Sequence, residues 1–177
     1  MKSSKGITLF ELVLFPILGV LMFVSKLLME FLPNIHLLGM FIMVFTLAFR
    51  YKALIPIYVY VFLVGIYGGF APWWFANLYT WTILWAVTMI LPQKMPTWLT
   101  SILYPAVCAL HGLCYGTLCA PAQALFFGLN WEGTLAWIVS GLPFDVAHGI
   151  GNLLTGLLIV PFVALLNRLK TRYYKSA

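Results

Sequence analysis

The hydrophobic pattern of this chain consists of long apolar runs that a few charged residues separate. A helix needs about 20 mostly apolar residues to cross the hydrocarbon core of a bilayer, so each run can be tested against that length. The pattern predicts an all-α protein, a six-transmembrane-helix bundle that forms one integral membrane domain over residues 1–177. The predicted spans are residues 7–31, 35–49, 53–70, 75–92, 98–119 and 141–166.

Breaks between these spans are set by turn-forming residues. Pro33 and Asn34 separate the first two spans. The stretch 53–93 carries no charge and is long enough for two spans, with glycine and proline at residues 68–72 supplying the turn between them. Residues 121–133 are predicted to form the longest loop.

Composition supports a membrane protein over a soluble one. The chain is 63% hydrophobic and 8% charged, whereas a soluble domain carries roughly 25% charged residues. With so few charged residues the chain could not cover its surface in water. In a lipid bilayer it need not, because apolar side chains can face outward toward the hydrocarbon. The net charge of +6 lies in predicted loops and tails rather than on one face, so we expect no nucleic-acid partner.

The basic residues predict the orientation. With the N-terminus inside, the inner segments hold Lys2, Lys5, Arg50, Lys52, Lys94, Arg168, Lys170, Arg172 and Lys175. Lys26 alone falls toward the outside, so the positive-inside rule places both termini in the cytoplasm. The first apolar run is longer than a signal-peptide core of roughly 7–15 residues, and no A-x-A-like site follows it, so we read it as a permanent helix of a cell (plasma) membrane protein.

Polar residues inside a membrane each need a reason, and the densest group lies in the sixth span. Asp145, His148 and Asn152 have the spacing i, i+3, i+7, which places them on one helix face. One interpretation is structural: Pro143 begins a helix, Asp145 offsets the dipole of its first turn, and the other two side chains bond neighbouring helices. The other interpretation, which we favour for the three together, is a ligand site.

A second polar group surrounds the first outer turn. Lys26 and Glu30 are four residues apart, so they either pair or extend to the headgroups. Asn34 and His36 lie in a loop facing the medium, where they either contact a ligand or cap a turn.

Aromatic residues gather at the outer ends of the predicted spans. They either bind a planar ring by stacking or form the girdle that is ordinary at a membrane interface. The candidate ligand-binding residues of this group, with one amide among them, are Trp73, Trp74, Asn77, Tyr79, Trp131 and Trp137.

Small residues in the fifth span indicate helix packing, and the absence of catalytic motifs excludes several classes of enzyme. Cys108, Gly112, Gly116 and Ala120 recur every four residues, a stripe that lets helices approach closely. The three cysteines read as small apolar fillers, so no metal site or disulfide is expected. The sequence has no G-x-x-x-x-G-K-[ST], H-E-x-x-H or G-x-S-x-G motif, so we expect no ATP hydrolysis and no cofactor.

Three segments together carry a family resemblance: residues 32–36, residues 72–81, and the run from Gly141 through Asp145 and His148 to Asn152. With these segments the chain resembles the S component of energy-coupling factor (ECF) transporters, over nearly its whole length. The resemblance implies an outward-facing pocket for a vitamin or related micronutrient. It also implies a membrane coupling subunit and two cytoplasmic ATPase subunits as partners, which deliver the ligand inward.

The resemblance leaves the docking site in doubt. The family often has A-x-x-x-A on its first helix for the coupling subunit, but the comparable stretch here, residues 15–19, has Gly19 as its one small residue. Docking is then expected at Gly19 with Ser25.

The leading hypothesis is therefore a substrate-binding subunit without enzymatic activity. Its site is expected to combine the aromatic residues with Asn34, His36, Asp145, His148 and Asn152. Two alternatives stay open: a small intramembrane enzyme with Asp145 and His148 as acid–base pair, and a stand-alone channel or secondary transporter. The resemblance does not identify the vitamin.

Overall fold

The computed structural model describes residues 6–32 and 34–174, with side chains described as far as residue 172. The sequence-based expectations for Lys2, Lys5, Pro33 and Lys175 lie outside this part of the chain. Within the described ranges every regular element is helical, as predicted. The elements are α1 (Leu9–Leu28), α2 (Leu38–Phe49), η1 (Arg50–Ala53), α3 (Leu54–Gly68), α4 (Pro72–Ile90), α5 (Thr97–Leu113), α6 (Tyr115–Phe127), α7 (Trp131–Gly156) and α8 (Ile159–Tyr174).

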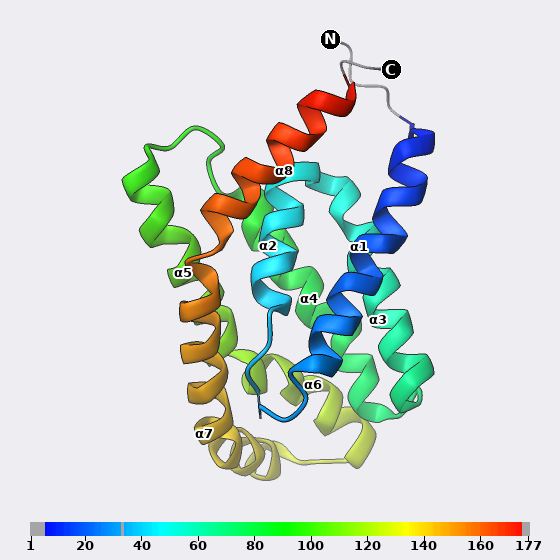
Figure 1. Cartoon of the computed structure of the whole chain (residues 1–177). Coiled ribbons are helices and arrows are strands. Elements are labelled where there is room, and N and C mark those ends of the chain that lie inside the picture. Colours follow the sequence, from blue (N-terminus) through cyan, green and yellow to red (C-terminus); the bar gives the residue numbers. More distant parts are fainter. Residues whose placement is uncertain (1–5, 33, 175–177) are drawn as a thin grey trace.

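The helices form an elongated bundle in which α1 begins and α8 ends at the same end (Figure 1). We call this the near end, and the opposite end, where α6 and α7 meet, the far end. Helix α2 runs toward the near end, and the chain turns at η1 so that α3 runs back (Figure 1). Arg50, at the start of η1, has a φ of 57°, which breaks the helix there.

Charged side chains fix both ends of α1. Thr8 and Glu11 form a capping box at its first turn, each side chain bonding the other residue's backbone N–H. Glu11 also pairs with Lys52 of η1 at 2.7 Å, with both side chains largely buried. At the far end, Lys26 and Glu30 pair at 3.1 Å on the surface, which is the first of the two alternatives that the sequence left open.

The region of the predicted fifth span, residues 98–119, contains parts of two helices. A helix ends at Leu113, and after Cys114 a new helix, α6, runs through Pro121 to Phe127, where Gly128 ends it in the left-handed conformation. The predicted loop over 121–133 is therefore mostly helix. Hydropathy registered the apolar run but not the change of direction at Cys114.

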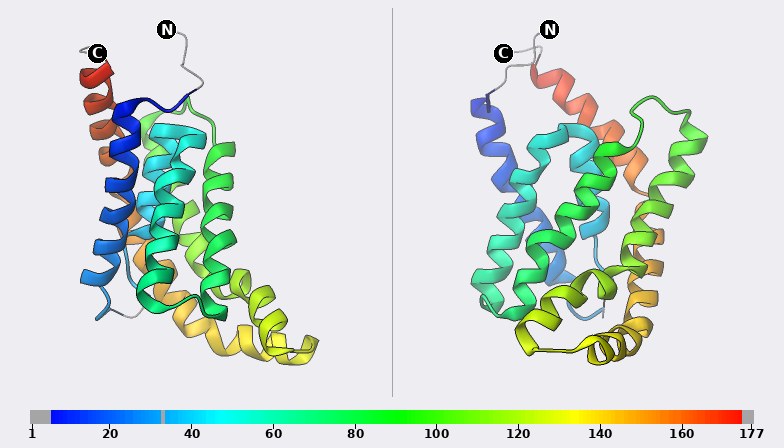
Figure 2. Two further views of the ribbon diagram at one scale, coloured as in Figure 1. Left: turned by 90° about the vertical axis from the view of Figure 1, so that its right-hand side faces the viewer. Right: turned by 180° about the vertical axis from the view of Figure 1, so that it is seen from behind.

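The helix of the predicted sixth span begins ten residues before residue 141, where the span was predicted to start. Helix α7 starts at Trp131, because the Asn130 side chain accepts a hydrogen bond from Gly133 N at 2.8 Å and so caps it. Pro143 lies inside this helix and is not its first residue. The first turns of α7 and all of α6 lie crosswise at the far end of the bundle (Figure 2). The chain bends by 47° between α7 and α8.

Three helical stretches are long and apolar enough to cross a membrane, and α7 with α8 makes a fourth if the bent pair is one span. The three are Leu9–Leu28, Leu38–Gly68 and Thr97–Phe127. Apolar side chains also cover the surface of α1, where Leu9 is 78% and Ile17 58% exposed. These features are those of a membrane protein, because such a surface is stable in lipid and not in water.

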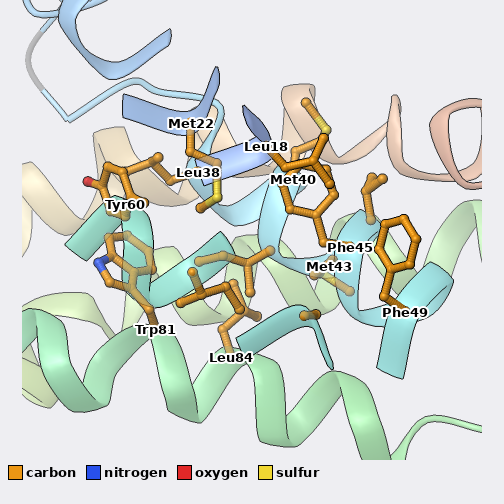
Figure 3. Close-up of a cluster of buried hydrophobic side chains, with 14 of the residues drawn as sticks. Leu18, Met22, Leu38, Met40, Met43, Phe45, Phe49, Tyr60, Trp81 and Leu84 are labelled. Carbon is orange, nitrogen blue, oxygen red and sulfur yellow. The ribbon is translucent and has the colours of Figure 1, made fainter. Parts of the chain in front are cut away.

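A buried apolar core lies between α1, α2, α3 and α4. It contains Phe15, Met22, Leu38, Phe45 and Leu84, each at most 2% exposed, and Trp81 lies at its edge (Figure 3). The small-residue stripe serves packing within the chain: Cβ atoms added at Gly112 or Gly116 would lie within 3.0 Å of α7 atoms. The bundle therefore positions α7 closely against α5.

Candidate functional site

The three polar residues of α7 face the interior of the bundle. Asp145 is 5% exposed, His148 2% and Asn152 0%. They span about 10 Å along the helix axis, since each residue adds about 1.5 Å. The predicted common face is thus present, and it points toward α5, α6 and α2.

Asp145 acts as a cap, but for another helix. Its Oδ1 accepts a hydrogen bond from Gly116 N at 2.9 Å, in the first turn of α6. A carboxylate at this point also offsets the α6 dipole. The interpretation in which Asp145 caps a helix begun by Pro143 is wrong, because α7 starts twelve residues upstream of Pro143. The second oxygen, Oδ2, is buried and has no hydrogen-bond partner.

Asn152 lies deepest in the group. Its Nδ2 donates to the Cys108 carbonyl oxygen at 3.1 Å and so joins α7 to α5. The glycines at 39 and 112 make room for it, because a Cβ on either would lie within 3.1 Å of its amide. Its Oδ1 is buried without a partner.

The three histidines of the chain converge beside these residues. The rings of His36 and His148 lie 4.7 Å apart in an edge-to-face arrangement, and Tyr115 lies 4.8 Å from His148. His111 lies 5.6 Å from Trp81, which is in turn 5.9 Å from His36. Segments far apart in sequence, from residue 36 to residue 148, therefore supply one continuous group of rings.

Helix α4 positions the tryptophan of this group. Trp81 Nε1 donates to Asn77 Oδ1 at 2.8 Å, one turn earlier on the same helix. His111 Nε2 donates to the carbonyl oxygen of Thr80 at 3.0 Å, which links α5 to α4. We define the buried polar cluster as His36, Thr80, Trp81, His111, Tyr115, Asp145, His148 and Asn152.

Several predicted site residues lie outside the cluster. Trp74 donates to the Val61 carbonyl oxygen at 2.8 Å, and Trp73 packs over Gly68, so both hold α4 against α3. Trp131 is 74% exposed at the start of α7.

The remaining predicted residues support the far end. Tyr79 Oη donates to the Leu118 carbonyl oxygen at 2.8 Å, and Trp137 packs on a small apolar cluster of α4 and α6. Asn34 is exposed in the loop before α2. Asn77 reaches the cluster through Trp81.

Sequence reasoning missed Thr80, Trp81, His111 and Tyr115 as site residues. A signal was present: His111 and Tyr115 are four residues apart, and Trp81 follows Asn77 by the same interval. The spacing of residues within one helix does not indicate which other helix it packs against. The sequence therefore could not predict that α4 faces α5.

The predicted docking residues face inward. Gly19 packs against Val59 and the Pro56 carbonyl oxygen of α3, and Ser25 is buried and donates to Met22 O at 2.7 Å. Helix α3 therefore occupies the face of α1 on which Gly19 lies. Both residues are buried in this structure, and docking of a coupling subunit at Gly19 and Ser25 stays a prediction.

The chemistry of the cluster is that of hydrogen bonding and stacking. The described part of the chain holds no group of three His, Cys, Asp or Glu residues arranged to bind a metal ion. Asp145 and His148 form no hydrogen bond with each other in this structure, and the alternative of an acid–base pair stays a prediction. A shallow open groove lies on α8 and is lined by Ala164, Asn167, Arg168, Thr171 and Arg172. The outward-facing ligand pocket that the sequence analysis expects stays a prediction.

No family model, curated protein or solved structure matches this chain.

Proposed function

We propose that this chain is the substrate-binding subunit of an ECF-type transporter. In this function it captures a vitamin or related small micronutrient outside the cell. It then delivers the ligand inward together with a separate membrane coupling subunit and two cytoplasmic ATPase subunits.

The buried polar cluster carries the proposal. Five of its residues have a buried nitrogen or oxygen atom without a hydrogen-bond partner, namely His36, His111, Asp145, His148 and Asn152. Each such atom costs about 1–3 kcal/mol relative to a bonded one. A bundle selected for stability alone would avoid this cost. A ligand that forms hydrogen bonds with these atoms would explain why they are present in the interior.

The placement of charge supports the orientation. The basic residues of η1, the α4–α5 connection and the last turns of α8 belong to segments at the near end (Figure 1). By the positive-inside rule this end belongs in the cytoplasm, and the far end then faces the medium. Asp145, on the α7 turn that contacts α6, lies toward that outer side.

The surface of α6 and the first turns of α7 cover the cluster from the far end. Phe126 of α6 packs on Phe75 of α4 with ring centroids 4.8 Å apart, and Asp145 holds the start of α6. Ligand entry in this proposal therefore requires movement of α6 with α7, or of the loop before α2.

Purification in mild detergent followed by native mass spectrometry tests the proposal. We expect a retained small molecule, and an added vitamin panel should include a compound that binds and quenches tryptophan fluorescence, since Trp81 lies in the cluster. His148→Ala should weaken that binding at least tenfold. Asn167→Ala, a polar residue on α8 at the near end, is the matched control and should bind normally.

Two results would overturn the proposal. One is that no retained molecule and no panel member binds. The other is that His148→Ala binds as tightly as the unchanged protein. Uptake by the purified chain alone in vesicles, without any ATPase, would instead favour a stand-alone transporter.

A further inference from the structure

Helix α8 packs on the bundle by one face and leaves the rest of its surface exposed. Ile159 is fully buried, and Val163 and Leu166 are partly buried against the same core. One turn beyond Leu166, Lys170 Nζ donates to the carbonyl oxygen of Ala48 in α2 at 2.7 Å. These α8 residues recur every three or four positions, so they form the stripe by which the helix is held to the bundle.

A second, apolar stripe of α8 is exposed. Phe162, Leu165 and Leu169 are 37%, 48% and 43% exposed. They are separated by three and four residues, so they lie on one side of the helix. The described part of the chain leaves this stripe uncovered, and it is therefore open to lipid.

A basic groove lies beside the apolar stripe. It is lined by Ala164, Asn167, Arg168, Thr171 and Arg172. The two arginines are four residues apart, so their guanidinium groups extend from neighbouring turns over one surface. Each also follows an exposed leucine by three residues, which places the groove and the apolar stripe side by side.

The two arginines carry charge that no acidic residue offsets. All four acidic residues of the chain lie outside α8, and within the described residues the side chain of neither Arg168 nor Arg172 forms an ion pair or a hydrogen bond. Lys170, by contrast, is bonded to α2 and lies over the Phe49 ring. A guanidinium donates paired N–H groups that match the oxygens of a phosphate, so the groove suits a phosphate group.

The direction of α8 brings this surface to the near end of the bundle. The chain bends by 47° before α8, and the helix then runs obliquely to the near end (Figure 1). In the proposed orientation this end is cytoplasmic, where the membrane surface carries anionic lipids. A helix with an apolar stripe beside a basic one is stable at such a surface, because acyl chains cover the first and headgroups the second.

We infer that the α8 groove binds the phosphate group of an anionic glycerophospholipid in the cytoplasmic leaflet. Arg168 and Arg172 donate to the phosphate oxygens, and the acyl chains lie along Leu165 and Leu169. The apolar stripe favours a lipid over a soluble phosphate, which has no apolar part to cover it. The inference uses the orientation given in the proposed function and does not depend on solute binding.

Lipid titration of the purified full chain in mild detergent tests this site, with native mass spectrometry counting the bound lipids. The probes are dioleoyl phosphatidylglycerol, which is anionic, and dioleoyl phosphatidylcholine, which is zwitterionic and has the same acyl chains. We expect phosphatidylglycerol to bind about tenfold more tightly, because it alone brings a net negative charge to the two arginines. Glycerol 3-phosphate in excess should not displace it.

Arg168→Gln and Arg172→Gln should each weaken the binding of phosphatidylglycerol about fivefold, because each removes one cation beside the headgroup. Arg168→Lys keeps the charge but not the paired N–H groups, so its loss should be smaller than that of Arg168→Gln. Lys94→Gln removes an exposed basic residue from the α4–α5 connection at the near end. It is the matched control, and its binding should be unchanged.

Four results would overturn the inference in variants that thermal unfolding shows to be folded. They are equal binding of the two lipids, unchanged binding when both arginines are replaced, an equal loss in Lys94→Gln, and displacement by glycerol 3-phosphate. If the double variant binds phosphatidylglycerol normally but loses a co-purifying subunit, the groove belongs to a protein partner instead. All of these are measured without a solute, so they leave the proposed function to the test with His148→Ala.

Discussion

At the scale of single residues, the site depends on glycines that allow close approach. Gly112 lies where a Cβ would be 2.9 Å from Asn152 Nδ2 and 2.9 Å from the carbonyl oxygen of His148. The second of these is a backbone atom, which cannot turn aside as a side chain does. The hydrogen bond from Asn152 to Cys108 O therefore requires a residue without a side chain at position 112.

Gly112→Ala should destabilise the protein by about 1–3 kcal/mol, because the added methyl group overpacks the contact between α5 and α7. Thermal unfolding in detergent, followed by circular dichroism, measures the change. Gly141→Ala is the control, since no atom lies within 4 Å of a Cβ there. That substitution should be neutral or stabilising by up to about 1 kcal/mol, as alanine favours the helix. Equal loss in the two variants would contradict this account.

At the scale of elements, two carboxylates tie helices to parts of the chain far away in sequence. Asp145 of α7 holds the first turn of α6, and Glu11 of α1 holds η1 through Lys52. Lys170 of α8 adds a third link, since its Nζ donates to Ala48 O at the last turn of α2 at 2.7 Å. Each link places charge against a helix end, where the dipole or an unpaired carbonyl favours it.

Lys52→Met should cost about 3–5 kcal/mol of stability, because it removes the ion-pair partner of a carboxylate whose side chain is 4% exposed and leaves its charge uncompensated by a cation in that pair. Lys26→Met breaks an ion pair whose acid is 53% exposed, so it should change stability by less than about 1 kcal/mol. Unfolding in detergent compares the two variants directly. A loss for Lys26→Met as large as that for Lys52→Met would contradict the difference in burial.

At the scale of the whole molecule, the polar residues lie at the two ends and inside the bundle, and the outer faces are apolar. The near end gathers the basic segments, the far end carries α6 and the start of α7, and the buried polar cluster lies inside (Figure 1, Figure 2). In a bilayer this arrangement predicts which segments each side of the membrane can reach.

Labelling of single cysteines checks that arrangement. In a background with Cys108, Cys114 and Cys119 replaced by alanine, Glu132→Cys at the start of α7 should react with a membrane-impermeant maleimide on intact cells. Lys94→Cys, in the connection between α4 and α5, should react only after permeabilisation. The reverse pattern would place the near end outside and contradict the orientation.

The sequence alone predicted the helical class, the apolar surface and the common face of Asp145, His148 and Asn152. These follow from local rules: hydropathy reports how much of a segment tolerates lipid, and helical spacing fixes which side chains share a face. The pairing of Lys26 with Glu30 was one of two alternatives that their spacing of four residues offered.

Only the tertiary structure decided which helices face one another. It brought His36, Trp81, His111 and Tyr115 to the α7 face, turned Gly19 toward α3, and assigned Asp145 to α6 instead of its own helix. Hydropathy does not predict which helices pack together. In a chain whose helices are apolar on nearly every face, it does not distinguish the buried face of a helix from the face exposed to lipid. Close contacts at glycines and a few hydrogen bonds between polar groups determine which helices pack together. Both kinds of contact join residues that are far apart in the sequence.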